Sequence, residues 1–218
     1  MESVKEEQIE KLLEDIASIQ AVIKNNRSIL RQIFLTSPFR LFFLILGLTV
    51  ILYSALFYFF VLYFGDFDAI PGFYKSLYYG LLFVTWLAFV LMKYITWLRT
   101  LRKIDSKYTL KRALKEVLTP KSIHILLPVT FVMIFLIIYL IFNEAYRFIV
   151  PAISIAIGLS YNFFGSITDI KPYLVVGYWL LITGTLIIAI GSIPIPIALA
   201  ASIGCGHVLF AAISHKED

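Results

Sequence analysis

The sequence predicts an all-α integral membrane protein, with six transmembrane helices in three hairpins and a cytoplasmic amphipathic helix with a heptad pattern before them. The first observation is composition: 60% of the residues are hydrophobic, 15% are charged, and the mean hydropathy is +0.88. The second is a set of long apolar segments, since a helix needs ~20 mostly apolar residues to cross a bilayer core. The six segments are residues 41–64, 73–98, 123–142, 148–165, 173–191 and 197–214.

A soluble bundle and a β-barrel fit the chain less well. A soluble domain of 218 residues cannot bury six helices that are apolar all round. The apolar runs are continuous, whereas the strands of a membrane barrel alternate. Residues 172–215 contain no Asp, Glu, Lys or Arg, and this length is about twice that of one span. The Gly and Pro residues of 191–196 therefore predict a turn between the last two spans.

Basic residues predict the cell membrane as the location and the cytoplasm as the side of both termini. Lys and Arg cluster before the first span and in the helical loop 99–122, whereas loop 65–72 carries two Asp and no Lys or Arg. Residues 104–118 form a cationic amphipathic pattern that predicts contact with anionic lipid. An ordinary basic cytoplasmic loop is the alternative. The net charge of +5 follows from these loops, so no nucleic-acid partner is expected.

The N-terminal region, residues 1–37, is predicted to be a cytoplasmic helix that associates with another helix. Residues 3–35 lack Gly and Pro and carry four apolar heptads, a pattern typical of a coiled coil. The repeat places Ile9, Ile16, Ile23 and Leu30 at position a and Leu12, Ile19, Asn26 and Ile33 at position d. A homo-oligomer or a helical partner is expected through residues 3–35, with Asn26 setting register. Further apolar residues widen the stripe, so docking on the membrane surface or on the same chain is an equal alternative.

Ionisable groups are scarce inside the predicted spans. No Asp or Glu falls in the middle of a span, which counts against proton-coupled or sodium-coupled transport. His207 is the only clearly intramembrane titratable residue apart from Cys205. A metal, haem or proton-relay role would need further ligands or partners, so the pattern favours a neutral imidazole that is hydrogen-bonded to a neighbouring helix. No metal and no cofactor are therefore predicted.

Polar residues of spans four to six are the candidates for a ligand site: Tyr161, Asn162, Tyr178, Thr183 and His207. An unpaired amide is costly in lipid, so Asn162 is expected to face protein or a cavity. The same residues can instead bond neighbouring helices together. Small residues recur at Gly177, Gly184 and Gly191, and at Ala198, Ser202 and Gly206. These series predict that spans four to six form the packed interior and that spans one to three face lipid.

These observations favour a non-enzymatic component of membrane assembly or regulation, including a sensor, that acts through its N-terminal helix. The alternative is a small-molecule transporter or channel with its site among spans four to six. A membrane-embedded enzyme comes third, with His207, Glu144 and Asp169 as its weak candidates. The chain has no phosphate-binding Gly-rich loop, no zinc-type spacing and no Gly-x-Ser-x-Gly motif. No catalytic residue is therefore assigned.

Overall fold

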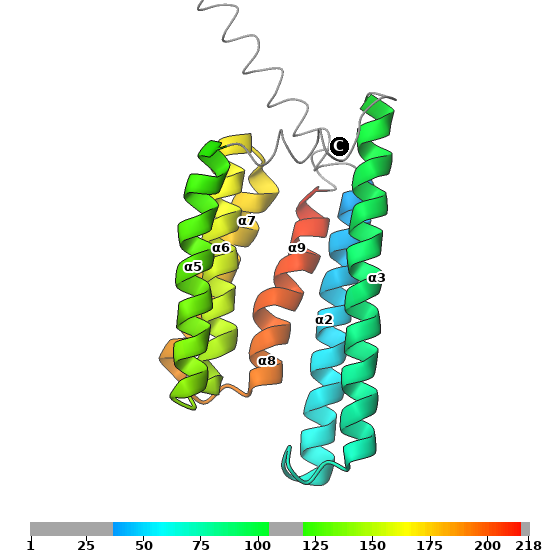
Figure 1. Ribbon diagram of the computed structural model, residues 1–218, viewed down its shortest axis with the longest axis vertical. Helices are drawn as coiled ribbons and strands as arrows, with labels where there is room; N and C mark the ends of the chain where they lie inside the picture. The colour runs from blue at the N-terminus through cyan, green and yellow to red at the C-terminus, as the bar shows by residue number, and fades with distance from the viewer. Residues whose placement is uncertain (1–36, 105–119, 215–218) are drawn as a thin grey trace, which may run out of the picture.

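Every regular element in the described part of the chain is a helix, which confirms the all-α prediction for that part. The computed structural model describes residues 37–104 and 120–214. Its elements in chain order are α2 (Ser37–Phe64), α3 (Gly72–Ile104), α5 (Pro120–Phe142), the 3₁₀ turn η1 (Tyr146–Phe148), α6 (Ile149–Thr168), α7 (Lys171–Ile190), α8 (Ile195–Leu199), the π-helical turn η2 (Ala200–Gly204) and α9 (Cys205–Ser214) (Figure 1).

Five helical stretches are long and apolar enough to cross a membrane, which is consistent with a multi-pass membrane protein. They are Phe39–Phe64, Gly72–Thr100, Tyr146–Ser166, Lys171–Ile190 and Ile195–Ser214. The third predicted span lies within the 23 residues of α5. The described apolar part of α5 is only Leu127–Phe142, which is shorter than a crossing needs. The sixth crossing therefore stays a prediction.

Several predicted features lie outside the described residues. The N-terminal helix with its heptad positions is one of them, and nearly all of the amphipathic segment 104–118 is another. Of the predicted basic helical loop 99–122, the structure describes residues 99–104 at the end of α3 and residues 120–122 at the start of α5.

Local sequence explains where the last helices begin and end. Asp169 follows α6 in the left-handed conformation, with φ 57°, which Asp tolerates better than most residues. Pro172 and Pro196 stand in the first turns of α7 and α8, where a missing backbone N–H costs nothing. Gly191 ends α7 with φ 68°, a conformation that glycine adopts without steric cost. The predicted turn between the last two spans is therefore present.

The helices form two groups with the last helix between them (Figure 1). Helices α5, α6 and α7 make one group, and α2 and α3 make the other. The chain from α8 to α9 contacts α7 on one side and packs more extensively on α2 on the other. The closest helix pair is α6 with α7. The last two spans are thus consecutive and antiparallel, yet the principal neighbour of the final span is α2.

Small residues lie at the close helix contacts, as predicted for spans four to six, but Gly191 ends α7, and a Cβ atom there would meet only Ile188 of its own helix. A Cβ atom on Gly158 of α6 would lie 2.8 Å from the carbonyl oxygen of Gly177 in α7. A Cβ atom on Gly184 would lie 3.0 Å from the carbonyl oxygen of Pro151. Ala198 is only 1% exposed. In the most apolar 18-residue stretch of the last span 44% of the residues are buried, against 11% in the corresponding stretch of the first span and 6% in that of the second.

The first span joins this interior through a glycine that the sequence pattern did not single out. A Cβ atom on Gly47 would lie 2.7 Å from the carbonyl oxygen of Gly204 and 2.8 Å from the backbone nitrogen of Val208. The backbones of α2 and the last span therefore meet directly at this point. The prediction that spans one to three face lipid applies to α3, whereas α2 has one face in the packed interior.

Candidate functional site

Buried and partly buried aromatic side chains from four helices surround His207, and we refer to this group as the aromatic cluster. Its members are Phe42 and Phe43 of α2, Tyr161 and Phe164 of α6, Tyr173 of α7, and His207 and Phe210 of α9. Phe89 of α3 packs against its edge, with its ring 5.9 Å from that of Phe42. The cluster contains residues of both groups of helices and of the last helix between them.

Both ring nitrogens of His207 have hydrogen-bond partners. Nδ1 lies 2.6 Å from the carbonyl oxygen of Ile203, and a carbonyl oxygen can only accept, so Nδ1 carries the proton. Nε2 lies 3.1 Å from the hydroxyl of Tyr161, which must then donate. The side chain is 4% exposed. This geometry is that of a neutral imidazole that joins two helices.

Ring packing holds His207 in this orientation. The ring of Phe43 stacks on the imidazole at 5.6 Å with an interplanar angle of 24°. Tyr173 meets Tyr161 edge-on at 5.2 Å and Phe210 at 4.7 Å. Edge-to-face and stacked pairs at these separations are favourable beyond their buried area. The imidazole is therefore fixed by hydrogen bonds in its plane and by rings around it.

Asn162 lies beside the cluster, but its side chain turns to α7. A Cβ atom on Gly177 would overlap the side-chain amide of Asn162, so the absence of a side chain at Gly177 makes room for this amide. Asn162 Oδ1 is buried, and no hydrogen-bond partner for it lies among the described residues. Asn162 thus faces protein, as its cost in lipid predicts.

The structure does not bring Tyr178 and Thr183 to the cluster. Tyr178 is 60% exposed, on the side of α7 opposite to the buried Tyr173, Gly177 and Leu180. The hydroxyl of Thr183 donates to the carbonyl oxygen of Trp179 in its own helix, at 2.7 Å. Of the five predicted ligand-site residues, Tyr161 and His207 are in contact, and Asn162 is adjacent to them.

Glu144 and Asp169, two of the three groups considered for catalysis, are far apart. Glu144 precedes α6 and Asp169 follows it, so about 30 Å of helix separates them. His207 lies on α9, with both nitrogens in use. Within residues 37–104 and 120–214, no group of three or more His, Cys, Asp or Glu residues is arranged to hold a metal ion.

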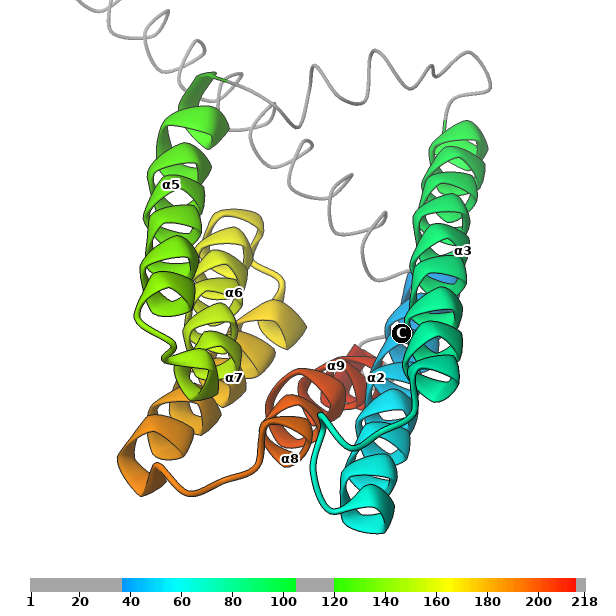
Figure 2. The same ribbon diagram turned by 60° about the horizontal axis from the view of Figure 1, so that its bottom comes forward.

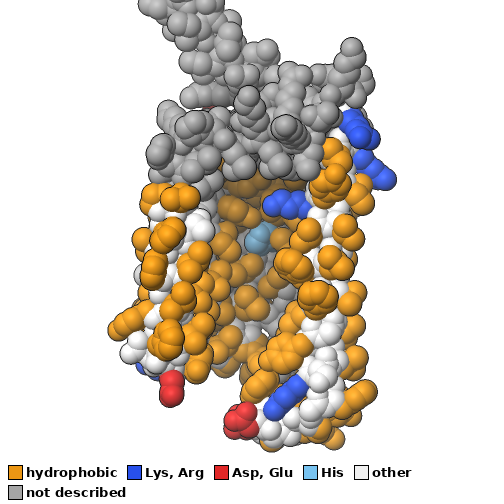
Figure 3. All heavy atoms as spheres, in the orientation of Figure 1, with side chains coloured by type: hydrophobic (Ala, Val, Ile, Leu, Met, Phe, Trp, Pro, Cys, Tyr) orange, Lys and Arg blue, Asp and Glu red, His pale blue; other side chains and the backbone are white. Residues whose placement is uncertain are grey.

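An apolar hollow opens in front of the cluster. In Figure 3 it lies between the side of the molecule formed by α5 and the side formed by α3, with a histidine side chain on its floor. His207 is the one histidine whose side chain the structure describes. Figure 2 shows the same separation of α5 from α3. No Asp, Glu, Lys or Arg is fully buried among the described residues, and Figure 3 shows a Lys or Arg side chain at the edge of the hollow beside the histidine.

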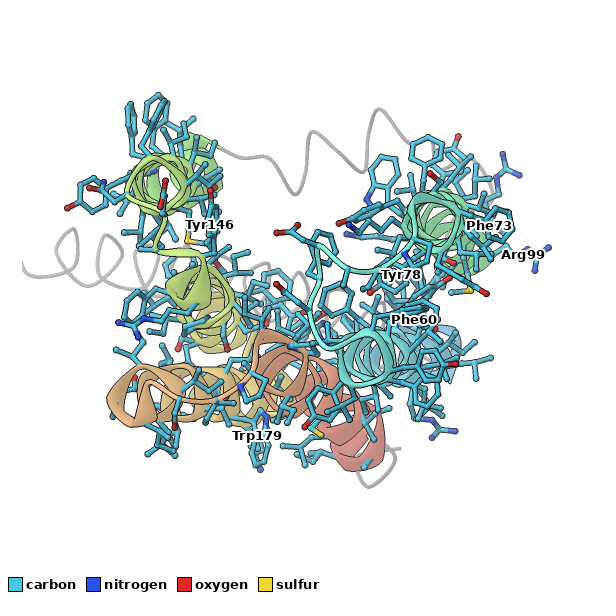
Figure 4. All side chains as sticks on the ribbon, turned by 90° about the horizontal axis from the view of Figure 1, so that it is seen from below. Phe60, Phe73, Tyr78, Arg99, Tyr146 and Trp179 are labelled. Atoms are coloured by element: carbon cyan, nitrogen blue, oxygen red, sulfur yellow. The ribbon has the colours of Figure 1, made fainter. Side chains whose placement is uncertain are left out.

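A second aromatic group joins α2 to α3 near the 65–71 connection. Phe60 and Tyr78 lie between these helices (Figure 4), with their rings 6.4 Å apart. The hydroxyls of Tyr53 and Thr85 are 2.7 Å apart. Lys75 Nζ donates to the carbonyl oxygen of Asp68 at 3.2 Å. These contacts attach α3 to α2 at one end and fit the predicted interfacial aromatics.

The π-helical turn of the last span is a feature that the sequence did not indicate. The indole nitrogen of Trp179 donates to the carbonyl oxygens of Ala201 at 3.1 Å and Ser202 at 3.2 Å. Trp179 lies on the face of the bundle away from α3 and α5 (Figure 4). A π turn interrupts the regular hydrogen bonds of backbone carbonyl oxygens, and the indole N–H of Trp179 provides a hydrogen-bond donor for them.

The chain has no match in comparisons with protein-family models, with curated proteins and with solved structures. What this region of the protein does must therefore follow from its geometry.

Proposed function

We propose that this chain is a six-span protein of the cell membrane and a non-enzymatic component of membrane assembly or regulation. The additional crossing, beyond the five stretches named above, is α5, which is third in chain order. Its 23 residues extend about 35 Å, which exceeds a bilayer core of about 30 Å. Figure 1 shows α5 beside α6 along its length, which supports a crossing at the same depth.

The cytoplasmic side is proposed to be the end where α2 and α5 begin and where α3 and α9 end. Figure 1 places these four ends together, with the 65–71 and 143–145 connections at the opposite end. Arg99, Arg102 and Lys171 belong to the first end, whereas the second end carries Lys75 and Arg147 together with Asp66, Asp68 and Glu144. The excess of basic residues on cytoplasmic loops supports this orientation, which puts both termini in the cytoplasm.

The observation that carries the assembly role is the incomplete packing of α3 and α5. Helix α3 packs mainly on α2, and α5 packs mainly on α6 and η1. Both helices keep exposed apolar side chains, among them Phe83 and Trp86 of α3 and Phe131 and Phe135 of α5, each more than half exposed. Helices in lipid associate by close packing, so another transmembrane segment can complete this bundle. The heptad pattern of residues 3–35 supports the same role on the cytoplasmic side.

A small-molecule transporter or channel is the second candidate, and Asn162 is the observation that favours it. Its buried Oδ1 has no described hydrogen-bond partner, so a ligand that donates a hydrogen bond could use it. The neighbouring polar groups of His207, Tyr161 and Thr183 are already bonded within the protein. Among the described polar groups of spans four to six considered for a ligand site, Asn162 Oδ1 is therefore the one that supports a polar path.

The assembly role predicts that the heptad seam sets the oligomer mass. We expect the double substitution Ile16→Lys and Ile19→Lys to reduce the mass of the detergent-solubilised protein to that of one chain, because two charges in a coiled-coil seam are poorly tolerated. The matched control is Ala17→Lys with Ser18→Lys, which adds the same charge outside the a and d positions. Light scattering after size-exclusion chromatography measures both masses.

The control protein should keep the mass of the unmodified protein. A full-length chain that is already monomeric in mild detergent, or a seam variant with unchanged mass, contradicts self-assembly through this helix.

A further inference from the structure

A groove separates α2 from the first half of the last span. Its volume is about 380 Å³, which is in the range of small-molecule sites. Ile51, Ser54, Ala55 and Tyr58 of α2 line one wall, and residues between Pro196 and Cys205 line the other. The groove is distinct from the aromatic cluster, since it shares no residue with it.

The backbone itself creates this groove. The two helices touch where Gly47 meets Gly204, and beyond this contact Ala55, Ala200 and Ala201 leave space between them. The π turn, which contains Ala200 and Ala201, is braced by the bond from Trp179 to the carbonyl oxygen of Ala201. The alanine positions of the wall have no side-chain rotamers that could fill this space, and the backbone beside Ala201 is held by Trp179.

The wall of the groove is suited to hydrocarbon. Most of its residues are aliphatic or alanine. The polar residue at mid-depth, Ser54, is 3% exposed, and its hydroxyl is closed off from the groove without a hydrogen-bond partner among the described residues. A ligand therefore gains little from a polar group here and is held by apolar contact.

The length and position of the groove indicate its occupant. The lining residues extend from Ile51 to Tyr58 on α2 and from Pro196 to Cys205 on the last span, which is about 10–14 Å along a helix. One leaflet of a bilayer core is about 15 Å thick. We infer that the groove binds one acyl chain of a phospholipid from the leaflet on the side of the 65–71 connection. This inference rests on membrane insertion and is independent of the assembly role.

Native mass spectrometry of the purified, delipidated full-length protein tests the inference. The probes are dipalmitoylphosphatidylcholine, with two acyl chains, and palmitoyl-lysophosphatidylcholine, with one. We expect one bound molecule of either probe. Ala55→Leu and Ala200→Leu should each weaken this binding at least about tenfold, because the added side chain occupies the groove. Ala189→Leu makes the same change on an exposed position of α7 outside the groove and should leave binding unchanged.

Two results would overturn the inference: no retained phospholipid on the unmodified protein, or equal binding by the Ala55→Leu and Ala189→Leu proteins. Binding of the two-chain probe without the one-chain probe would contradict recognition of a single chain. Helical circular dichroism and elution volume verify the fold of each variant. If Ala200→Leu disturbs the π turn, the result for Ala55→Leu alone tests the inference. Ala55 is exposed on α2, so a larger side chain there does not disturb the helix.

Discussion

Among single residues, His207 shows most directly how a polar group is accommodated inside this bundle. Its imidazole donates to Ile203 and accepts from Tyr161, so neither nitrogen faces hydrocarbon. The hydroxyl of Ser154 makes a comparable link, since it donates to the carbonyl oxygen of Leu180 across the α6–α7 contact at 2.9 Å. Hydrogen bonds between helices in lipid contribute modestly to stability. These side chains therefore fix which faces of the helices meet.

The bond between Tyr161 and His207 can be tested by removing one hydroxyl. We expect Tyr161→Phe to lower the free energy of unfolding by about 1 kcal/mol, because Nε2 of a buried imidazole loses its donor. Tyr178→Phe removes the same group from a side chain that is 60% exposed and should have little effect. Unfolding in mixed micelles with increasing dodecyl sulfate compares the two. Equal losses would show that the hydroxyl of Tyr161 is not a structural donor.

The sequence identified the polar members of the site and missed the apolar ones. Tyr161, Asn162 and His207 stand out because polar groups are rare in apolar segments. Phe43 and Tyr173 carry no such signal, since an aromatic residue is ordinary in a membrane span. The prediction of Tyr178 and Thr183 did not consider which face of α7 packs against the other helices. The spacing of Gly177 and Gly184 indicates that face, because residues seven apart lie on the same face of a helix.

At the level of the elements, the sequence predicts where a helix begins and ends better than it predicts which helices pack together. Gly191 and Pro196 stop and restart the chain as predicted, since their effects are local. Helix α3 extends beyond its predicted span because Arg99 and Arg102 are compatible with a helix that leaves the bilayer. The pairing of α2 with α9 depends on one glycine, Gly47, whose role appears only when the two backbones are placed together.

The contact of α2 with the last span predicts a strong effect at Gly47. We expect Gly47→Ala to lower the free energy of unfolding by about 1–3 kcal/mol, because the new Cβ meets backbone atoms that cannot rotate away. Gly80→Ala is the matched control on α3, where a Cβ atom would meet nothing within 4 Å. The control should be neutral or stabilising by up to about 1 kcal/mol, since alanine favours a helix. The same micelle titration measures both, and a neutral Gly47→Ala would contradict the direct backbone contact.

For the whole molecule, the arrangement of helices is more open than the sequence indicates. The final span stands between the α2–α3 group and the α5–α7 group, and α3 and α5 border the hollow without meeting. Hydropathy gives the number and length of apolar segments, but it carries no information about lateral placement in a bilayer. The hollow and the exposed faces of α3 and α5 therefore emerge only from the three-dimensional arrangement. They are the basis of the proposed assembly role.

Six crossings with both termini in the cytoplasm are the central claim, and labelling of single cysteines in intact cells tests it most directly. With Cys205→Ser removing the one native cysteine, the chain can carry Asp68→Cys, Glu144→Cys, Ser192→Cys or Asp169→Cys, one at a time. An impermeant maleimide should label the first three in intact cells and the fourth only after permeabilisation. Labelling of Asp68→Cys and Asp169→Cys in intact cells, with Glu144→Cys and Ser192→Cys protected, would show that α5 does not cross and would contradict the claim.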